Sequence, residues 1–254
     1  MTMESLILTD HAGWRQITLT RPTVKNALDT ATPHALADAV VLAAADLGIR
    51  DVQIDGADGN FAARADMSEI DGKTAAEGVA DLRKGDWASI RIFAKPASAA
   101  VDGFALGGGS DLARMAEFIE LGQTTRLGLT ETNLGLIPGA GGAQRLLAVT
   151  GRARATRMVL TDKVIDAATA FDWGIAACLA PGAALPDAFT LTARLAQRVP
   201  LALQPAKAAM VQGDETRRAL AHKCAAFEDL LDTADTAESI QAFGDKPKPL
   251  FRGQ

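Results

Sequence analysis

The sequence predicts an α/β fold followed by a helical C-terminal region. Up to about residue 185, short apolar runs typical of strands alternate with stretches typical of helices, whereas from Pro186 onward only helical patterns occur. A chain of 254 residues, 48% of them hydrophobic, is long and apolar enough to fill one large interior. We therefore expect one large domain with a smaller helical extension.

The N-terminal part of the chain predicts a hairpin and then a helix. The β-favouring runs Leu6–Thr9 and Trp14–Thr20 are separated by turn residues, a spacing that favours a hairpin. Thr32, followed by proline, predicts an N-cap with Pro33 at the first helical position. The alanine-rich stretch His34–Ala45 then continues the helix.

The middle of the chain continues the alternation of strand and helix, and the C-terminal part predicts helices alone. Gly174 fits a helix C-cap, and the prolines at 200 and 205 punctuate the later helices. A long amphipathic helix is expected over Glu215–Phe243, and residues 72–93 form a helical stretch of mixed polarity. The alternating segments are Val52–Ile54, Ala97–Val101, Asp111–Glu120, Ala153–Leu160 and Ala167–Trp173.

Composition excludes several classes of function. The formal net charge is -5 and 5% of residues are aromatic, so no basic or base-stacking surface favours nucleic acid, and none favours an anionic membrane. The two cysteines form no CxxC pair and the three histidines are not clustered, which argues against a disulfide framework or a metal site. Since the chain shows no leader pattern and no transmembrane-length apolar run, we expect a cytoplasmic protein.

Three clusters of small residues are candidates for a functional site. They are FAARAD (residues 61–66), GFALGGGSD (103–111) and GLIPGAGG (135–142). Three successive glycines between a strand and a helix leave backbone N–H groups open to a ligand oxygen. The same pattern is also typical of a tight strand-to-helix turn, and the spacing alone does not decide between the two interpretations.

Other chemistries lack their motifs. The dinucleotide fingerprint, the P-loop and the GxSxG nucleophile elbow are all missing, and no histidine lies near the glycine clusters in the sequence. The carboxylates of Asp111 and Glu131, which adjoin the glycine-rich segments, remain as proton carriers. Taken alone, both could be solvated surface charges, and this alternative is stronger for Asp111, which could be a first-turn residue favoured by the helix dipole.

Together these segments resemble the crotonase (enoyl-CoA hydratase/isomerase) superfamily in order and spacing, over nearly the whole chain. The resemblance implies a spiral of ββα units in residues 1–195 and a helical oligomerisation region in residues 196–254. It also implies a homotrimer or homohexamer acting on acyl-CoA thioesters without a metal or separate cofactor, since coenzyme A is part of the substrate. The segments that carry it are ITLTRPTVKNAL (17–28), FAARADMSEI (61–70), KPASAAVDGFALGGGSDLA (95–113), LGLTETNLGLIPGAGGAQRL (127–146), LTDKVIDAATAFDWGI (160–175) and AFEDLLDTADTAESIQAFGDKPKPLFRG (226–253).

The resemblance also assigns site residues. The backbone N–H groups of Ala65 and Gly108 match the oxyanion hole that binds the thioester carbonyl in relatives. Glu131 matches the principal acid/base residue, and Asp111 stands where hydratases usually carry a second glutamate. The residues that match the CoA- and substrate-binding positions are Lys25, Ala63, Arg64, Asp66, Met67, Ser68, Gly107 and Gly109.

Two carboxylates favour an enoyl-CoA hydratase, with an isomerase second and an acyl-CoA-binding homologue with little activity as a further alternative. The Asp111 side chain is shorter than that of glutamate by one bond of ~1.5 Å, so its carboxylate reaches less far toward the substrate, and this weakens the case for hydration. A dienoyl-CoA isomerase would need a third acidic residue at the position where this chain has Gly139.

Arg64 stands where relatives usually have a glycine. If its φ is positive, the backbone is strained there; otherwise Arg64 binds a CoA phosphate or a substrate carboxylate, or is surface decoration. Ser68 stands where a phosphate-binding lysine is frequent.

Overall fold

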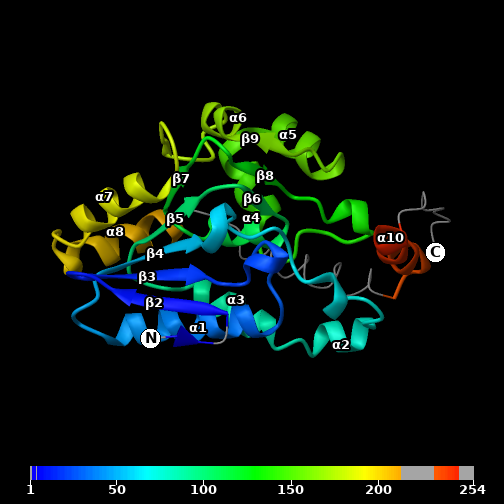
Figure 1. Ribbon diagram of the computed structural model, residues 1–254, viewed down its shortest axis with the longest axis horizontal. Coiled ribbons are helices and arrows are strands. Elements are labelled where there is room, and N and C mark those ends of the chain that lie inside the picture. The colour runs from blue at the N-terminus through cyan, green and yellow to red at the C-terminus, as the bar shows by residue number, and fades with distance from the viewer. Residues whose placement is uncertain (1, 4, 213–231, 246–254) are drawn as a thin grey trace.

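The computed structural model describes residues 2–3, 5–212 and 232–245, and its centre is a seven-stranded sheet. The strands follow the order β1-β2-β3-β4-β5-β7-β10 (Figure 1). From β3 to β10 all neighbours are parallel, whereas β1, β2 and β3 are antiparallel. The bounds are β1 Thr2–Met3, β2 Leu6–Asp10, β3 Trp14–Leu19, β4 Asp51–Gly56, β5 Ala97–Val101, β7 Phe118–Leu121 and β10 Cys178–Leu179.

A second sheet of three strands lies beside the first and gives the fold its spiral character. Its order is β6-β8-β9, with β6 Phe104–Leu106, β8 Arg126–Gly128 and β9 Ile165–Asp166. The chain therefore passes from β5 to β6 to helix α4 (Gly108–Ala113), and then from β7 to β8 to helix α5 (Gly142–Leu160). Each pass is one ββα unit, which confirms the predicted class of fold.

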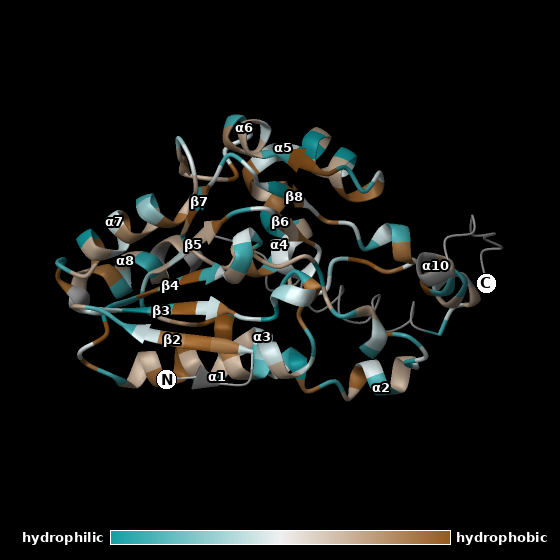
Figure 2. Cartoon of the chain, viewed as in Figure 1, coloured by the Kyte–Doolittle hydropathy of each residue, from teal (hydrophilic) through white to brown (hydrophobic). Residues whose placement is uncertain are grey.

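Helices cover both faces of the large sheet. Helix α1 (Ala31–Ala45) and helix α3 (Arg83–Arg91) lie on one side, and helix α7 (Leu185–Leu195) lies on the other (Figure 1). The core side of α1 is apolar because Leu36, Val40 and Ala43 are buried. In Figure 2, β2 is mainly hydrophobic, although only Leu6 and Leu8 of its residues are buried. Helices α5 and α6 (Ala167–Asp172) mix both kinds of residue, as expected for surface helices.

The predicted hairpin and strands are confirmed, but the predicted start of the first helix is wrong. Helix α1 begins at Ala31, and Thr32 is already helical rather than the N-cap. Asp29 supplies the capping oxygen instead, because its Oδ1 accepts the Thr32 N–H at 2.9 Å. Pro33 consequently lies at the third helical position.

Other predicted segments differ in extent. The segment Asp111–Glu120 divides between the end of α4 and strand β7, and α5 begins eleven residues before Ala153 and is kinked at Gly151, whose φ is 73°. Gly174 lies directly after the α6 C-cap with φ 74°, as the C-cap prediction requires. Within residues 72–93 the structure has two helices, α2 (Ala75–Val79) and α3.

Beyond Pro186 the part of the chain that the structure describes contains helices alone, as predicted. These are the rest of α7, then α8 (Pro200–Gln212), with Pro205 inside it, and α10 (Ala234–Asp245). Most of the predicted Glu215–Phe243 helix lies outside the described residues, and α10 coincides with its final part. None of the described helices is long and apolar enough to cross a membrane.

Candidate active site

A cavity of about 760 Å³ lies between the small sheet, α4 and the segment leading to α3. The glycine-rich segments, far apart in the sequence, meet at this cavity. All the predicted site residues except Gly109 line it, namely Lys25, Ala63, Arg64, Ala65, Asp66, Met67, Ser68, Gly107, Gly108, Asp111 and Glu131. Gly109 is buried behind this wall, where a Cβ atom would lie 2.0 Å from the Ala62 carbonyl oxygen.

The first wall of the cavity is a short parallel pairing between Leu28 and Ala65. The Leu28 N–H donates to the Arg64 carbonyl, and the Asp66 N–H donates to the Leu28 carbonyl, both at 2.8 Å. In a parallel pairing these two bonds leave the N–H of the central residue pointing away from its partner. The Ala65 N–H accordingly has no hydrogen-bond acceptor among the residues that the structure describes.

The second wall is the turn into α4. Gly107 is the N-cap, with φ 50° and ψ -122°, a conformation that only glycine adopts without strain. Gly108 is the first helical residue, so its N–H has no partner within the helix, and no described acceptor outside it. A Cβ atom on Gly108 would lie 3.7 Å from the Ala65 nitrogen, which shows that the two residues are close neighbours.

Two carboxylates adjoin these amides. A Cβ atom on Gly107 would lie 3.1 Å from the Glu131 Oε1 atom, so glycine at this position also makes room for the glutamate. Asp111 is 1% exposed, and its Oδ2 atom accepts the Ala140 N–H at 2.9 Å. The GAGG turn fits closely around Asp111, because a Cβ atom on Gly142 would lie 1.9 Å from its Oδ1 atom.

Arg114 is a charged residue near this site that the sequence analysis missed. It is 7% exposed and follows Asp111 by one helical turn. Burial lowers the pKa of Arg114 to about 10, although the charges of Asp111 and Glu131 act to raise it. The available signal was an arginine within an otherwise apolar stretch, Leu112 to Ala116, directly after the acid.

Arg64 and Lys25 supply positive charge to the cavity. Arg64 does not have a positive φ, so of the alternatives for this position a strained backbone is excluded. Its guanidinium is half-buried, and burial lowers the pKa of Arg64. Lys25 holds its Nζ atom 4.5 Å from the centre of the Phe104 ring, and its carbonyl accepts the Ala63 N–H at 3.0 Å.

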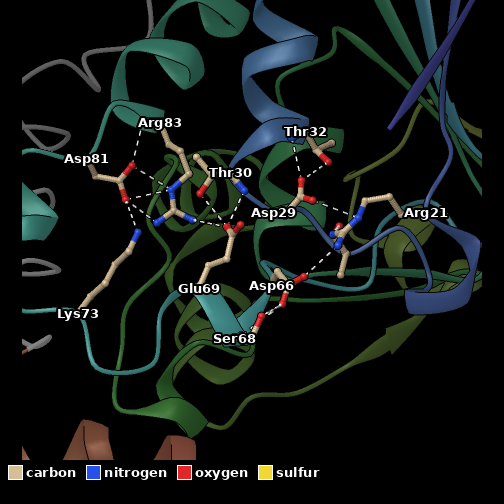
Figure 3. Close-up of polar contacts among 11 residues, drawn as sticks. Arg21, Asp29, Thr30, Thr32, Asp66, Ser68, Glu69, Lys73, Asp81 and Arg83 are labelled. Carbon is tan, nitrogen blue, oxygen red and sulfur yellow. Dashed lines mark hydrogen bonds and ion pairs between the residues drawn. The ribbon is translucent and has the colours of Figure 1, made fainter. Parts of the chain in front are cut away.

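Asp66 and Ser68 line the cavity, but their side chains bind other parts of the chain (Figure 3). The Ser68 hydroxyl donates to the Asp66 Oδ1 atom at 2.8 Å, and Arg21 Nη2 donates to Oδ2 at 3.1 Å. Arg21 also pairs with Asp29 at 3.2 Å and donates to the Ala27 carbonyl. Arg21 therefore links the two segments that form the Leu28–Ala65 pairing.

A second group of charges holds the segment between Glu69 and Arg83 against the start of α1 (Figure 3). Glu69 accepts from the Thr30 N–H at 2.6 Å, and Asp81 binds both Arg83 and Lys73. Burial would raise the pKa of Asp81, but its hydrogen bonds with Arg83 and Lys73 outweigh burial and lower that pKa to about 2. Asp81 and Arg83 both line the cavity.

Comparisons with known proteins agree with this arrangement. A family model described as enoyl-CoA hydratase/isomerase matches residues 9–254. A 2,3-dehydroadipyl-CoA hydratase from Escherichia coli K12 is 38% identical, over 99% of this chain and 100% of the relative. A probable enoyl-CoA hydratase from Rhizobium meliloti is 34% identical, over 99% of each chain. The crystal structure of a carnitinyl-CoA hydratase from Mycobacterium avium superposes with a TM-score of 0.88, at 29% identity and full coverage of both chains.

Proposed function

Since the chain belongs to the enoyl-CoA hydratase/isomerase family, we propose that it reversibly hydrates a trans-2-enoyl-CoA thioester with Ala65, Gly108, Glu131 and Asp111 as its machinery. The observation that carries this assignment is the pair of N–H groups on Ala65 and Gly108. Ala65 and Gly108 lie close together and line one cavity, and neither N–H group has an acceptor among the described residues.

The two amides suit a reaction that passes through a thioester enolate. When water adds to C3 of the enoyl group, negative charge develops on the thioester oxygen, and donors fixed in advance stabilise that charge selectively. Loss of one such donor typically costs about 3–4 kcal/mol of transition-state stabilisation. Because the donors are backbone groups held by the Leu28 pairing and by the α4 turn, they need little reorganisation.

The carboxylates divide the proton transfers. Asp111 takes a proton from the attacking water as its oxygen bonds to C3, and Glu131 delivers a proton to C2 of the resulting enolate. In the reverse direction Glu131 removes the C2 proton and Asp111 protonates the departing hydroxyl group. None of these steps requires a metal or a separate cofactor, so we expect a chelator to leave the turnover unchanged.

Isomerisation of a 3-enoyl-CoA is the second candidate. Asp111 is short and its Oδ2 atom is engaged by Ala140, which leaves Glu131 as the carboxylate beside the two amides. One proton carrier suffices for an isomerase, which moves a proton between C2 and C4. A third candidate is an acyl-CoA-binding homologue with little turnover.

An absorbance assay separates these candidates. The purified protein is incubated with crotonyl-CoA, and the loss of the conjugated enoyl absorbance reports hydration. A 3-enoyl-CoA tested in parallel reports isomerisation as a gain of the same absorbance. Loss with crotonyl-CoA supports the hydratase; a gain with the 3-enoyl substrate alone supports the isomerase; binding without either change supports the third candidate.

We also propose that Arg64 and Lys25 bind the phosphates of coenzyme A, because both are cationic and line the cavity. The test is the affinity of Arg64→Gly for coenzyme A at low and high salt. Weaker binding than wild type, most marked at low salt, supports the role. Equal affinity of the variant and wild type at both salt concentrations would exclude this role for Arg64.

Residues 196–254 are proposed as an oligomerisation region of a cytoplasmic homotrimer or homohexamer. The support is the family membership and the helical character of the described part of this region. Light scattering on the full-length protein measures the mass directly. A monomeric mass near 26.5 kDa would contradict this proposal.

A further inference from the structure

The turn that carries Glu131 is held from a side that does not line the cavity. Glu131 directly precedes the short 3-10 helix η4 (Thr132–Leu134), and its carbonyl accepts the N–H groups of Leu134 at 2.9 Å and Leu136 at 3.1 Å. Glu131 and Leu134 line the cavity, but Thr132 does not. The Thr132 hydroxyl lies instead 2.8 Å from the carbonyl of Val159, near the end of α5.

Asp162, in the turn between α5 and β9, binds the two residues that follow Glu131. Its Oδ1 atom lies 2.7 Å from the Thr132 hydroxyl and accepts the Asn133 N–H at 3.2 Å. One carboxylate oxygen therefore ties the start of η4 to a segment some thirty residues further along the chain. Because both bonds are formed directly after Glu131, they restrict the backbone from which its side chain projects.

The backbone of Asp162 is itself unusual, since its φ is 49°. This left-handed region favours glycine, and a residue with a side chain occupies it at a cost. A glycine would form the turn between α5 and β9 more easily, but it would offer no oxygen to Thr132 and Asn133. Strained backbone of this kind persists where surrounding contacts hold it, and it is concentrated at functional sites.

The other end of the Glu131 turn is held independently. Gly135 is the C-cap of η4, and its carbonyl accepts the Thr236 hydroxyl of α10 at 2.9 Å. The turn would consequently stay attached if the contacts of Asp162 were lost. Its start would be freer, however, and the Glu131 carboxylate is closely placed, since a Cβ atom on Gly107 would lie 3.1 Å from its Oε1 atom.

We propose that Asp162 is a positioning residue for Glu131. Through Thr132 and Asn133 it fixes the backbone that presents the Glu131 carboxylate to C2 of the substrate. This inference rests on the proposed function, in which Glu131 carries the proton to and from C2. A displacement of a catalytic group by about 1 Å can cost up to about 10²-fold in rate, so a loosened turn should lower kcat more than it changes KM.

The test is steady-state kinetics with crotonyl-CoA on two variants of Asp162. Asp162→Gly removes the carboxylate and suits the positive φ, so it should fold and should lower kcat about ten-fold with little change in KM. Asp162→Asn keeps the accepting oxygen and tolerates the left-handed conformation, so it should retain the wild-type kcat. The matched control is Asp58→Gly, because Asp58 also has a positive φ, of 54°, but is exposed and does not line the cavity. It should leave kcat and KM unchanged.

Thr132 provides a second, independent variant. Thr132→Val removes the hydroxyl and keeps the shape of the side chain, so it should lower kcat less than Asp162→Gly, which also loses the bond to Asn133. Added to Asp162→Gly, it should cause little further loss, because the two residues act through one contact. Full, independent losses from the two changes would contradict the proposed linkage.

Hydrogen exchange gives a readout without turnover, which separates failure of this inference from failure of the proposed function. Amide exchange over residues 131–136 should be faster in Asp162→Gly than in wild type and should return to the wild-type rate in Asp162→Asn. Should wild type fail to hydrate crotonyl-CoA, the hydratase proposal fails, whereas this difference in exchange would still support the hold of Asp162 on the turn.

Three results would overturn the inference. One is unchanged amide exchange in Asp162→Gly, which would show that the carboxylate does not hold the turn. The second is faster exchange with the wild-type kcat, which would show that the turn does not position Glu131. The third is an equal loss of kcat in Asp162→Gly and Asp162→Asn, because the accepting oxygen is present in one and absent from the other.

Discussion

Position 109 admits only glycine, because β6 and α4 bring the backbone of Ala62 within contact distance. We predict that Gly109→Ala lowers the free energy of unfolding by about 1–3 kcal/mol, since its Cβ would lie 2.0 Å from the Ala62 oxygen. Gly85→Ala is the control: nothing lies within 4 Å of its Cβ position in α3, so it should stabilise by about 0.5–1 kcal/mol. Equal denaturation midpoints for the two variants would contradict this packing.

The carboxylate of Asp111 can be tested apart from its shape. Asp111→Asn keeps the oxygen that accepts from Ala140 but removes the base, so we expect kcat for crotonyl-CoA to fall about 10²-fold or more. Asp172→Asn makes the same chemical change at an exposed position of α6 and should leave kcat unchanged. Hydration at the wild-type rate by the Asp111→Asn enzyme would remove Asp111 from the mechanism.

The meeting of the proposed site residues at one cavity was predictable where a motif carries them. Ala65, Gly108 and Glu131 stand in segments whose order and spacing resemble a known family, and the structure brings all three to one cavity. Arg114 was missed, because a single arginine within an apolar stretch is only a weak signal that its side chain faces inward. Nor could the sequence show that the Asp66 and Ser68 side chains bind one another rather than pointing to a ligand.

At the scale of elements, Arg21 links the two chain segments whose pairing presents the Ala65 amide. It donates to the carbonyl of Ala27, next to Leu28, and to Asp66, next to Ala65. Arg21→Ala should therefore lower the free energy of unfolding by about 1–3 kcal/mol and kcat/KM by about ten-fold, because the amide loses its alignment.

The control is Asp10→Ala, which breaks an ion pair with Arg15 in which the Asp10 side chain is 55% exposed, and should cost less than about 1 kcal/mol. Titration with urea and steady-state kinetics measure both effects. If Arg21→Ala loses stability but keeps the wild-type kcat/KM, the linkage does not position Ala65.

Elements were predictable where local signals coincide with the fold. The β2–β3 hairpin follows from two β-favouring runs around a turn, and its register pairs Leu6 with Leu19. The start of α1 was missed because Asp29 caps it from outside the Thr-Pro pattern. The segment 111–120 was not resolved into a helix and a strand, because its apolar residues fit either period.

At the scale of the whole molecule, the face of the large sheet beneath α7 is unusually acidic. Asp51, Gln53 and Asp55 alternate with Val52 and Ile54 along β4, and all five are buried. This polar side faces α7, because Gln53 pairs with Ser98, whose hydroxyl lies 2.8 Å from that of Thr192. Burial raises the pKa of Asp51 to about 7 and, with some opposition from a backbone hydrogen bond, that of Glu120 to about 7.

From the raised pKa values of Asp51 and Glu120 we predict that the free energy of unfolding falls as the pH rises. The pKa values of these two carboxyls are higher in the folded than in the unfolded protein, so between about pH 4 and pH 7 the folded protein binds more protons than the unfolded one. The stability that comes from this proton binding is present at low pH and is lost as the pH rises across this range. Asp51→Asn should raise the free energy of unfolding at pH 8 by on the order of 2 kcal/mol and flatten its pH dependence.

Asp81 gives the opposite dependence of stability on pH. Its pKa is lowered to about 2, so its contribution is present at neutral pH and lost as pH falls from about 4 to 2. Asp81→Asn should therefore destabilise the protein at pH 7. Chemical denaturation from pH 4 to pH 8 checks both variants, and an Asp51→Asn curve parallel to wild type would contradict the assignment.

The spiral itself could not be derived from local patterns. Strand and helix alternation predicts an α/β class, but it does not show that β6 and β8 leave the large sheet to form a second one. That step depends on three-residue strands and glycine turns whose pairing is decided by distant contacts. It was predictable only through resemblance, which covers the chain as a whole.

The central claim is that the Ala65 and Gly108 amides polarise one thioester carbonyl, and isotope-edited infrared spectroscopy tests it most directly. In Glu131→Gln, which should bind without turnover, the carbonyl stretch of ¹³C-labelled crotonyl-CoA is predicted to move to lower frequency on binding. A bound carbonyl that vibrates as it does in free solution would contradict the account.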